Sequence, residues 1–383
     1  MKIFAGSLTA VAIVAVFSFS TPVVQTAPPK PNASPKIQVA ILLDVSGSME
    51  GLIEQAKAQL WSMVNTLGKA QCADKTQPRV ELALYEYGRT NNDAGKGYVK
   101  QLSPFTNDLD QVSKILFSLR TNGGDEYCGQ VIYTSMEELG WETSPGNYKV
   151  IFIAGNEDFL QGDLHYTKAC KKAKDKGIIV NTIYCGSYQQ GIKEHWNLAG
   201  ECGEGSYTNI DHNAREADIP TPYDSALLVL NTKLNSTYIG YGALGHDNMK
   251  RQAEVDQLNF SVSSSVASKR ISAKARSNVY DNSSWDLVDA VRTDSSYLTK
   301  LDKKTLPDSL KNKSPEQLKQ FVSGKTIERT AIQNEIQSVN LSRAKYIADE
   351  KAKAALSSNE PTLESAVEKT IKEQVKRFRM VID

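Results

Sequence analysis

The 383-residue chain is predicted to form an α/β domain with a doubly wound, mostly parallel sheet, followed by a mainly α-helical region. Up to about residue 210, short apolar runs of strand length alternate with segments of helical periodicity, which is typical of parallel strands joined by crossover helices. After Pro220 the apolar runs disappear and helical periodicity takes over. A hydrophobic fraction of 40% suffices for ordinary cores and excludes a wholly disordered chain.

The first predicted strand, Ile37 to Leu43 (IQVAILL), is apolar except for Gln38 and leads directly into Asp44. An apolar run of this length is typical of a strand that is buried on both faces of a sheet. A short strand over 97–102 is expected at an edge of the sheet, and a last strand over 205–210. The other predicted strands are 80–87, 148–154 and 178–184.

The helix predicted after the first strand, over 51–67, places Leu52, Ala56, Leu60, Met63 and Leu67 on one face. The same reasoning predicts helices over 108–119, 127–139, 166–174 and 195–199. These helices fall between the predicted strands, so we expect them to cover both faces of the sheet.

In the second half, Ser314-Pro315-Glu316-Gln317 is a capping-box start of a helix. Two apolar stripes with steps of three and four residues follow, one within 332–346 and one within 363–382. They predict either helices that pack on each other or on the first domain, which we favour, or a coiled coil for self-association. The basic end of the chain is expected to be a solvated helix face rather than a membrane-binding surface.

The N-terminus has the pattern of a secretory signal. Lys2 precedes an apolar stretch from Ile3 to Phe19, and small residues and prolines follow. We predict a signal peptide over 1–26, a Pro-rich linker over 27–35, the α/β domain over 36–215 and the helical region over 221–383. An uncleaved anchor is the alternative, although the run is short for a spanning helix. The protein is therefore expected to be secreted or periplasmic.

The five cysteines fit an exported protein, because oxidising compartments permit disulfides. The odd number leaves at least one thiol unpaired, and the spacing does not give the connectivity. No Cys-x-x-Cys pair supports a zinc ribbon or a thioredoxin-type site. The net charge of +1 gives no overall field for nucleic acid, and membrane contact is not expected once the signal is removed.

The most informative segment is DVSGSM, at the junction of the first strand and the first helix. Asp44, Ser46 and Ser48 offer a carboxylate and two hydroxyls, which are hard oxygen ligands suited to Mg²⁺, and also to Ca²⁺ or Mn²⁺. In open α/β sheets, ligands bind beyond the carboxyl ends of the strands. The alternative is that Ser46 or Ser48 only caps the helix. An EF-hand is excluded because Met49 stands where that loop requires glycine.

With ILLDVSGSM, GLIEQAKAQL, Gly123-Gly124 and YKVIFIAGN, the chain resembles the von Willebrand factor A domain family over about 36–211. The resemblance implies strand order 3-2-1-4-5-6 and a metal-ion-dependent adhesion site, in which a cation binds an acidic group of a protein partner. In that site a Thr after the Gly-Gly turn and an Asp at the end of the central strand assist the Asp-x-Ser-x-Ser turn. The second half resembles the tails of exported bacterial proteins with this domain, through TYIGYG (237–242) and WDLVDA (285–290).

Two ligand positions depart from the family's pattern. Asp125 follows the Gly-Gly turn where Thr is expected, and Gly155 stands where Asp is expected. Glu157 or Asp158 is then expected to reach the cation, and the resulting candidate metal ligands are Asp44, Ser46, Ser48, Asp125 and Glu157. A second carboxylate beside Asp44 favours retention of the cation and weakens its attraction for an acidic partner.

Enzyme motifs are absent from the sequence: there is no Gly-x-Ser-x-Gly, no His-Glu-x-x-His and no phosphate-binding glycine loop. A thiol enzyme using Cys128 or Cys185 with His195 remains an alternative, but burial or disulfide bonding explains these thiols more simply. We therefore expect a non-catalytic binding protein. The other alternative is a scaffold with a metal-free site that binds partners through its helical tail.

Overall fold

The computed structural model describes residues 35–211, 219–354 and 363–382. The predicted signal peptide and all of the predicted linker except Pro35 lie outside these residues. The described residues belong to one compact unit. Within the described ranges, no helix is both long enough and apolar enough to cross a membrane.

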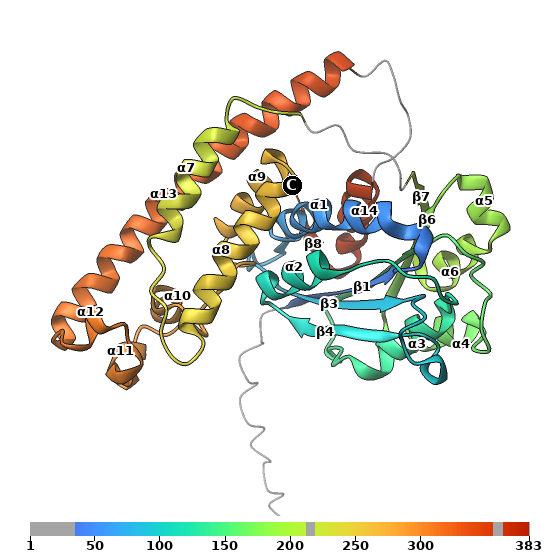
Figure 1. Ribbon diagram of the computed structural model, residues 1–383, viewed down its shortest axis with the longest axis horizontal. Coiled ribbons are helices and arrows are strands. Elements are labelled where there is room, and N and C mark those ends of the chain that lie inside the picture. Colours follow the sequence, from blue (N-terminus) through green and yellow to red (C-terminus); the bar gives the residue numbers. More distant parts are fainter. Residues whose placement is uncertain (1–34, 212–218, 355–362, 383) are drawn as a thin grey trace, which may run out of the picture. The chain divides into compact units, whose positions relative to one another are not determined.

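The main sheet has the strand order β4-β3-β1-β5-β6-β7 and confirms the predicted doubly wound, mostly parallel architecture (Figure 1). Its strands are β1 (Lys36–Asp44), β3 (Arg79–Tyr87), β4 (Lys100–Thr106), β5 (Tyr148–Gly155), β6 (Ile179–Cys185) and β7 (Glu204–Ile210). β1 lies at the centre, parallel to β3 and β5, and only β4 is antiparallel to its neighbour. When the six strands of this sheet are numbered in chain order, without β2, the order is 3-2-1-4-5-6, as the resemblance implied.

The edge strand β4 begins three residues later than the sequence predicts. Gly97 and Tyr98 have positive φ angles, 68° and 57°, so the chain turns there instead of extending. Such backbone angles are incompatible with a strand, and a pattern of apolar residues does not reveal them.

Helices cover both faces of the sheet. On one face, α1 (Glu50–Leu67) and α2 (Leu109–Ser118) pack against alternate residues of the strands, such as Val39 and Leu43 of β1. On the other face, α3 (Cys128–Glu138), α4 (Tyr166–Lys176) and α6 (Trp196–Cys202) pack against the intervening residues, such as Ala40 and Leu42. Both faces of β1 are therefore buried, as its sequence predicts. A short helix, α5 (Tyr188–Lys193), was not anticipated.

The helical region lies between β7 and the C-terminal segment. Its larger helices are α7 (Asp224–Asn235), α8 (Gly245–Val262), α9 (Ser264–Lys274) and α13 (Pro315–Ala354). The shorter helices are α10 (Leu287–Thr293), α11 (Tyr297–Lys300) and α12 (Asp308–Lys311). The capping box is confirmed: Gln317 N donates to Ser314 Oγ, and Ser314 N donates to Gln317 Oε1. The stripe within 332–346 includes the buried Ile332 and Ile336, on the part of α13 that packs against α7 and α9.

The C-terminal segment returns to the α/β part. Helix α14 (Leu363–Gln374) buries its stripe in the core shared with α1 and the sheet, and Tyr148 Oη donates to Gln374 Oε1 over 2.8 Å. After it, β8 (Met380–Val381) pairs antiparallel with β2 (Gln71–Cys72), a small sheet that sequence patterns do not reveal. Residues 363–382 thus pack on the α/β part, and 219–354 form a helical insertion before them.

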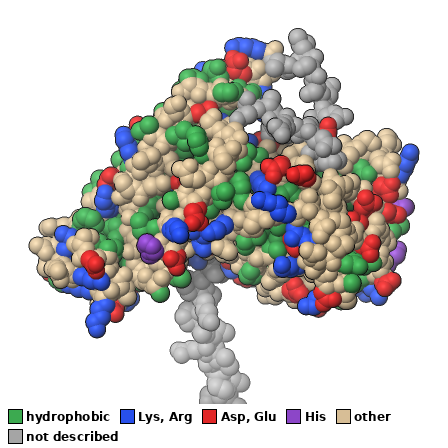
Figure 2. Space-filling view, in the orientation of Figure 1, with side chains coloured by type: hydrophobic (Ala, Val, Ile, Leu, Met, Phe, Trp, Pro, Cys, Tyr) green, Lys and Arg blue, Asp and Glu red, His purple; other side chains and the backbone are tan. Residues whose placement is uncertain are grey.

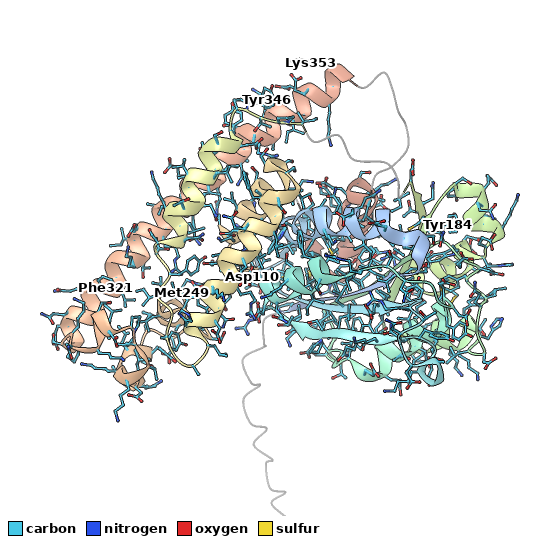
Figure 3. The ribbon with its side chains drawn as sticks, viewed as in Figure 1. Asp110, Tyr184, Met249, Phe321, Tyr346 and Lys353 are labelled. Carbon is cyan, nitrogen blue, oxygen red and sulfur yellow. A yellow bond between two sulfur atoms is a disulfide. The ribbon has the colours of Figure 1, made fainter. Side chains whose placement is uncertain are left out.

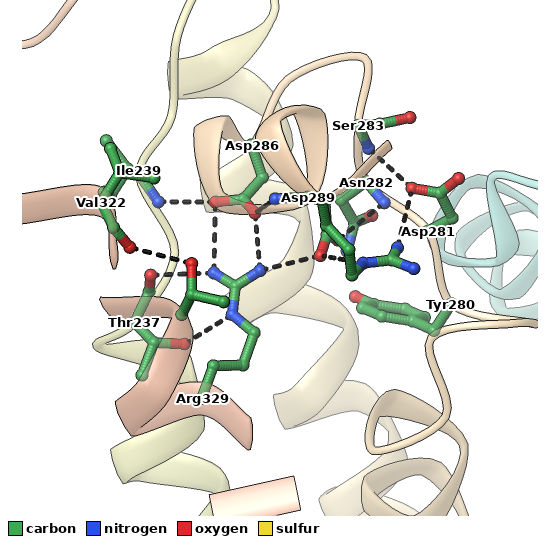
Figure 4. A network of polar contacts seen from close by, with 12 residues as sticks. Thr237, Ile239, Tyr280, Asp281, Asn282, Ser283, Asp286, Asp289, Val322 and Arg329 are labelled. Carbon is green, nitrogen blue, oxygen red and sulfur yellow. Dashed lines mark hydrogen bonds and ion pairs between the residues drawn. The ribbon is translucent and has the colours of Figure 1, made fainter. Parts of the chain in front are cut away.

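The segments TYIGYG and WDLVDA meet around a buried arginine (Figure 4). Arg329 of α13 forms ion pairs with Asp286 and Asp289 at 2.6 and 3.0 Å and donates to the Thr237 carbonyl. Asp286 also accepts from Ile239 N over 2.7 Å and from Asp289 N, which caps α10. These contacts assign both segments a structural role, since each buried charge is paired.

A second buried network joins the helical insertion to the α/β part. Arg270 of α9 pairs with Asp110 of α2 and with Asp256 of α8, each at 2.6 Å, and Lys274 pairs with Asp256 at 3.0 Å. Tyr280 Oη donates to the other oxygen of Asp110 over 2.7 Å. Figure 3 shows Asp110 at the junction of these helices. Two positive and two negative charges are therefore balanced in the interior.

One disulfide is present among the described residues, between Cys170 of α4 and Cys202 of α6. Cys128 and Cys185 are buried thiols, and Cys72 is a partly buried thiol. This pairing resolves the connectivity that the sequence left open.

We predict that Asp110→Asn lowers the free energy of unfolding by about 3 kcal/mol or more, because it leaves the buried Arg270 and Lys274 with one carboxylate. Urea unfolding measures the change. The matched control is Glu254→Gln, which breaks the exposed ion pair between Lys114 and Glu254 that also joins α2 to α8. That control should change stability little; equal effects of the two variants would contradict the prediction.

Candidate metal centre

The candidate centre lies where the central strands end. β1 finishes at Asp44, and the turn after it contacts the loop that precedes α3. Asn122 N donates to the Val45 carbonyl over 2.9 Å, and Thr90 N donates to the Gly123 carbonyl over 2.8 Å. The turn after β1, the end of β3, the 122–126 loop and the end of β5 therefore meet at the carboxyl edge of the sheet. Ligand sites occupy this position in open α/β sheets.

The turn holds its polar side chains close together. Ser46 N donates to Asp44 Oδ1 over 2.8 Å, and the hydroxyl oxygens of Ser46 and Ser48 lie 3.3 Å apart. Ser48 Oγ also donates to Asn156 Oδ1, at 3.4 Å, across to the loop after β5. Ser46 is the N-cap residue of a short 3-10 helix, Gly47–Met49, but its side chain makes no capping bond. Helix capping therefore does not account for its hydroxyl.

Asp44 is fully buried, and its Oδ2 has no hydrogen-bond partner. Burial raises the pKa of its carboxyl to about 7, although hydrogen bonds from Ser46 act in the opposite direction, and the charge of Glu157 adds to the rise. A buried carboxylate with an unpaired oxygen is costly unless a positive charge compensates it. The structure thus keeps an acidic group in water-poor surroundings directly after the central strand.

Two glycines allow this arrangement. A Cβ at Gly88 would lie 2.8 Å from Asp44 Oδ1, and a Cβ at Gly155 would lie 3.0 Å from Asp44 Oδ2 and 2.5 Å from Tyr87 Oη. Tyr87 Oη donates to the Ala154 carbonyl over 3.0 Å, so it has little freedom to move. The family's Asp at position 155 would not fit beside these groups, which explains the departure seen in the sequence.

The acidic residue closest to Asp44 in the 122–126 loop is Glu126. Glu126 is 8% exposed. A Cβ at Gly88 would lie 3.0 Å from Glu126 Cγ and 2.8 Å from Asp44 Oδ1, so both acidic side chains lie against this glycine. Burial raises the pKa of Glu126 to about 8, with further increases from the charges of Asp44, Glu157 and Asp125. Sequence reasoning missed Glu126 because Asp125 occupies the family's Thr position.

Asp125 itself is exposed, and its Oδ2 accepts a hydrogen bond from Tyr127 Oη at 3.4 Å. It is near enough to raise the pKa of Glu126, so it belongs to the same acidic loop. The structure therefore brings Asp44, Ser46 and Ser48 together and turns the Asp125 side chain toward Tyr127. In an irregular segment neighbouring side chains point in different directions, and no pattern in the sequence says which of the two faces inward.

The loop after β5 carries the remaining predicted ligand. Glu157 acts electrostatically on both Asp44 and Glu126, and its carbonyl accepts from Trp196 Nε1 over 2.7 Å. Asp158, the alternative, is engaged elsewhere: its Oδ1 lies 3.0 Å from His195 Nδ1 and accepts from Leu160 N. Of the two, Glu157 is the residue whose charge acts on Asp44 and Glu126.

The donor set suits a hard cation bound partly through water. Among the described residues, no three His, Cys, Asp or Glu side chains are close enough to hold an ion by themselves. The donors that do converge are the Asp44 carboxylate and two serine hydroxyls, with Glu126 and Glu157 close by. Burial raises the pKa of the Cys128 and Cys185 thiols well above the ordinary value, so neither offers a thiolate.

No protein-family profile and no curated protein matches the chain. Solved structures are similar to part of it. A von Willebrand factor type A structure from Catenulispora acidiphila is 15% identical with a TM-score of 0.35, over 46% of this chain and 39% of that one. The pilus adhesin SpaC from Lactobacillus rhamnosus GG, in its open conformation, is 16% identical with a TM-score of 0.35, over 48% and 28%.

Proximal thread matrix protein 1 from the mussel byssus, with a zinc-occupied MIDAS motif, is 12% identical with a TM-score of 0.34, over 46% of this chain and 42% of that one. The match thus spans less than half of each of these three chains, and likenesses this low carry no argument about function. The strand order of the sheet and the Asp-x-Ser-x-Ser turn at the end of its central strand carry the assignment: the chain contains a von Willebrand factor A-like domain.

Proposed function

We propose that this protein is a non-catalytic binding protein that uses a divalent cation at the Asp44 turn to engage an acidic group on a protein partner. The observation that carries the proposal is the buried Asp44 carboxylate with its unpaired Oδ2, beside Glu126 and Glu157. No basic side chain within the described ranges pairs with any of these three carboxylates. A cation would supply the missing positive charge.

Asp44, Ser46 and Ser48 would hold the ion, directly or through water, and Glu126, Glu157 and Asp125 would add negative charge around it. Oxygen ligands of this kind favour Mg²⁺, with Ca²⁺ and Mn²⁺ as alternatives. The turn is open on one side, since Gly47 and Ser48 are exposed. An acidic side chain of a partner could reach the ion there.

The surrounding carboxylates should set the strength of that contact. Each one neutralises part of the ion's charge, which favours retention of the ion and reduces its attraction for another carboxylate. We therefore propose a cation that stays bound between encounters with the partner. The N-terminal pattern of the sequence supports action outside the cytoplasm, in a secreted or periplasmic protein. Figure 2 supports a protein partner over a nucleic acid, because acidic and basic side chains are interspersed on the visible face.

In chelator, Asp44→Asn should stabilise the folded protein at pH 8 by a few kcal/mol, to order of magnitude, and much less at pH 5. The sign follows from the raised pKa of Asp44: its ionisation opposes folding, and the cost grows as the pH rises from about 4 through about 7. Urea unfolding at both pH values measures it. Asp158→Asn, which removes a partly exposed charge nearby, is the control. Destabilisation by Asp44→Asn at pH 8 would contradict the prediction.

Thermal unfolding in chelator, Mg²⁺, Ca²⁺ and Mn²⁺ tests the cation itself. A ligand that binds only the folded state stabilises it by about 2.7 kcal/mol at a hundredfold excess over its dissociation constant. We expect an ion-dependent rise in the midpoint of unfolding, and Asp44→Ala should abolish it. In Glu126→Gln the rise should require a higher ion concentration, because a carboxylate that favours retention of the ion is lost.

Asp125→Asn provides the matched control, because it removes the neighbouring carboxylate of the same loop. We expect it to shift the ion dependence less than Glu126→Gln does, since Asp125 is exposed and contacts Tyr127. A midpoint that no ion moves in the wild type would count against the proposed cation and favour a scaffold that binds through its helices.

A further inference from the structure

A groove of about 1950 Å³ runs along α1. It begins at Gly47 and Ser48 of the candidate metal centre and ends near Lys69 and Arg276, with the end of α8, then α9 and α13, forming the opposite side. At a rise of about 1.5 Å per residue, the two ends lie about 30 Å apart. The groove therefore connects the proposed cation with a distant basic end.

The basic side chains of Lys69 and Arg276 line that end of the groove. Arg276 Nε is buried without a hydrogen bond, and neither side chain forms an ion pair with a described residue. Burial lowers the pKa of both groups, and the positive charge of Arg276 lowers that of Lys69 further. Unpaired charges of this kind are costly, and a bound anion would compensate them.

Two acidic residues near the basic end of the groove are already engaged. Glu364 accepts from Ser62 Oγ and pairs with Lys269 at 2.8 Å. Glu368 favours the charged form of Lys69 but pairs with Lys372 at 2.8 Å. The far end is consequently left with positive charge that the described part of the chain does not neutralise.

Between the two ends the groove offers apolar surface and polar atoms without partners. Val262 and Leu341, which line it, are 39% and 75% exposed. Asn65 Oδ1 and Asn340 Nδ2, on opposite sides of the groove, are buried without a hydrogen bond. Apolar side chains together with amide groups suit an extended peptide, whose backbone requires hydrogen-bond partners and whose side chains alternate in direction.

We propose that the groove binds an extended segment of the partner, about nine residues long, with an acidic residue near each end. At about 3.3 Å per residue, nine residues span the distance from the Asp44 turn to Arg276. One acidic residue would contact the cation at the Asp44 turn, and the other would pair with Arg276 and Lys69. The first contact rests on the proposed function, whereas the second does not require a cation.

The test uses a fluorescein-labelled nonapeptide with blocked ends, Asp at its first and last positions and alternating Leu and Ser between them. Three companion peptides carry Asn at the first, the last or both of these positions. Fluorescence anisotropy in Mg²⁺ should show the doubly acidic peptide binding wild-type protein about tenfold more tightly than either singly acidic one. In the double variant Lys69→Gln, Arg276→Gln, the doubly acidic peptide should bind no better than a singly acidic one.

The matched control is Arg120→Gln. Arg120 also lines the groove, but its guanidinium donates to the carbonyls of Phe117 and Leu119, so its loss should leave the preference intact. Thermal unfolding of each variant checks that it is folded. Failure of the doubly acidic peptide to bind, or equal binding by wild type and the Lys69, Arg276 variant, would overturn the proposal.

Repeating the titration in chelator separates the two proposals. If chelator has no effect while the double variant still loses affinity, the proposed contact with a cation is contradicted and the proposed contact with Arg276 and Lys69 is supported. If chelator weakens binding and the double variant does not, the cation is supported and the groove proposal fails.

Discussion

The structure depends on the burial of β1 at the centre of the sheet, with neighbouring strands on both sides and helices on both faces. An apolar strand in this position gains most by excluding water, and its last residue is Asp44. The carboxylate is consequently held where hydration is poor, with one oxygen bonded to Ser46 N and the other unpaired. The same burial that stabilises the sheet thus leaves a poorly compensated negative charge at the candidate metal centre.

Buried ion pairs as well as apolar contacts hold the helical insertion against the α/β part. Arg270 and Lys274 bring two positive charges into the interior, and Asp110 and Asp256 balance them. Such a network specifies one arrangement, because any displacement of α9 would leave a buried charge unpaired. The insertion then lies beside α1, and the groove between them follows from that placement. α14 completes the same face, which makes the C-terminal residues part of the α/β core.

The candidate site was only partly predictable. The Asp44 turn was identifiable because the strand, the turn and the helix that follow one another in the sequence are contiguous there. Glu126 was not, because its approach to Asp44 depends on Gly88 after β3, some forty residues earlier in the chain. Arg276 was equally hidden, because its lack of an ion pair with any described residue is a property of the fold. The edge strand was misplaced by the left-handed turn at Gly97 and Tyr98.

The sequence by itself determined the α/β class, the position of the central strands, the start of α13 and the grouping of Asp44, Ser46 and Ser48 at one turn. These features follow from local periodicity and from contiguous residues, in which propensity and burial act together. Tertiary structure alone decided the Cys170–Cys202 pairing, the return of α14 to the sheet, and which acidic residue of the 122–126 loop faces Asp44. Each of these depends on contacts between residues far apart in the chain, whose geometry no local pattern encodes.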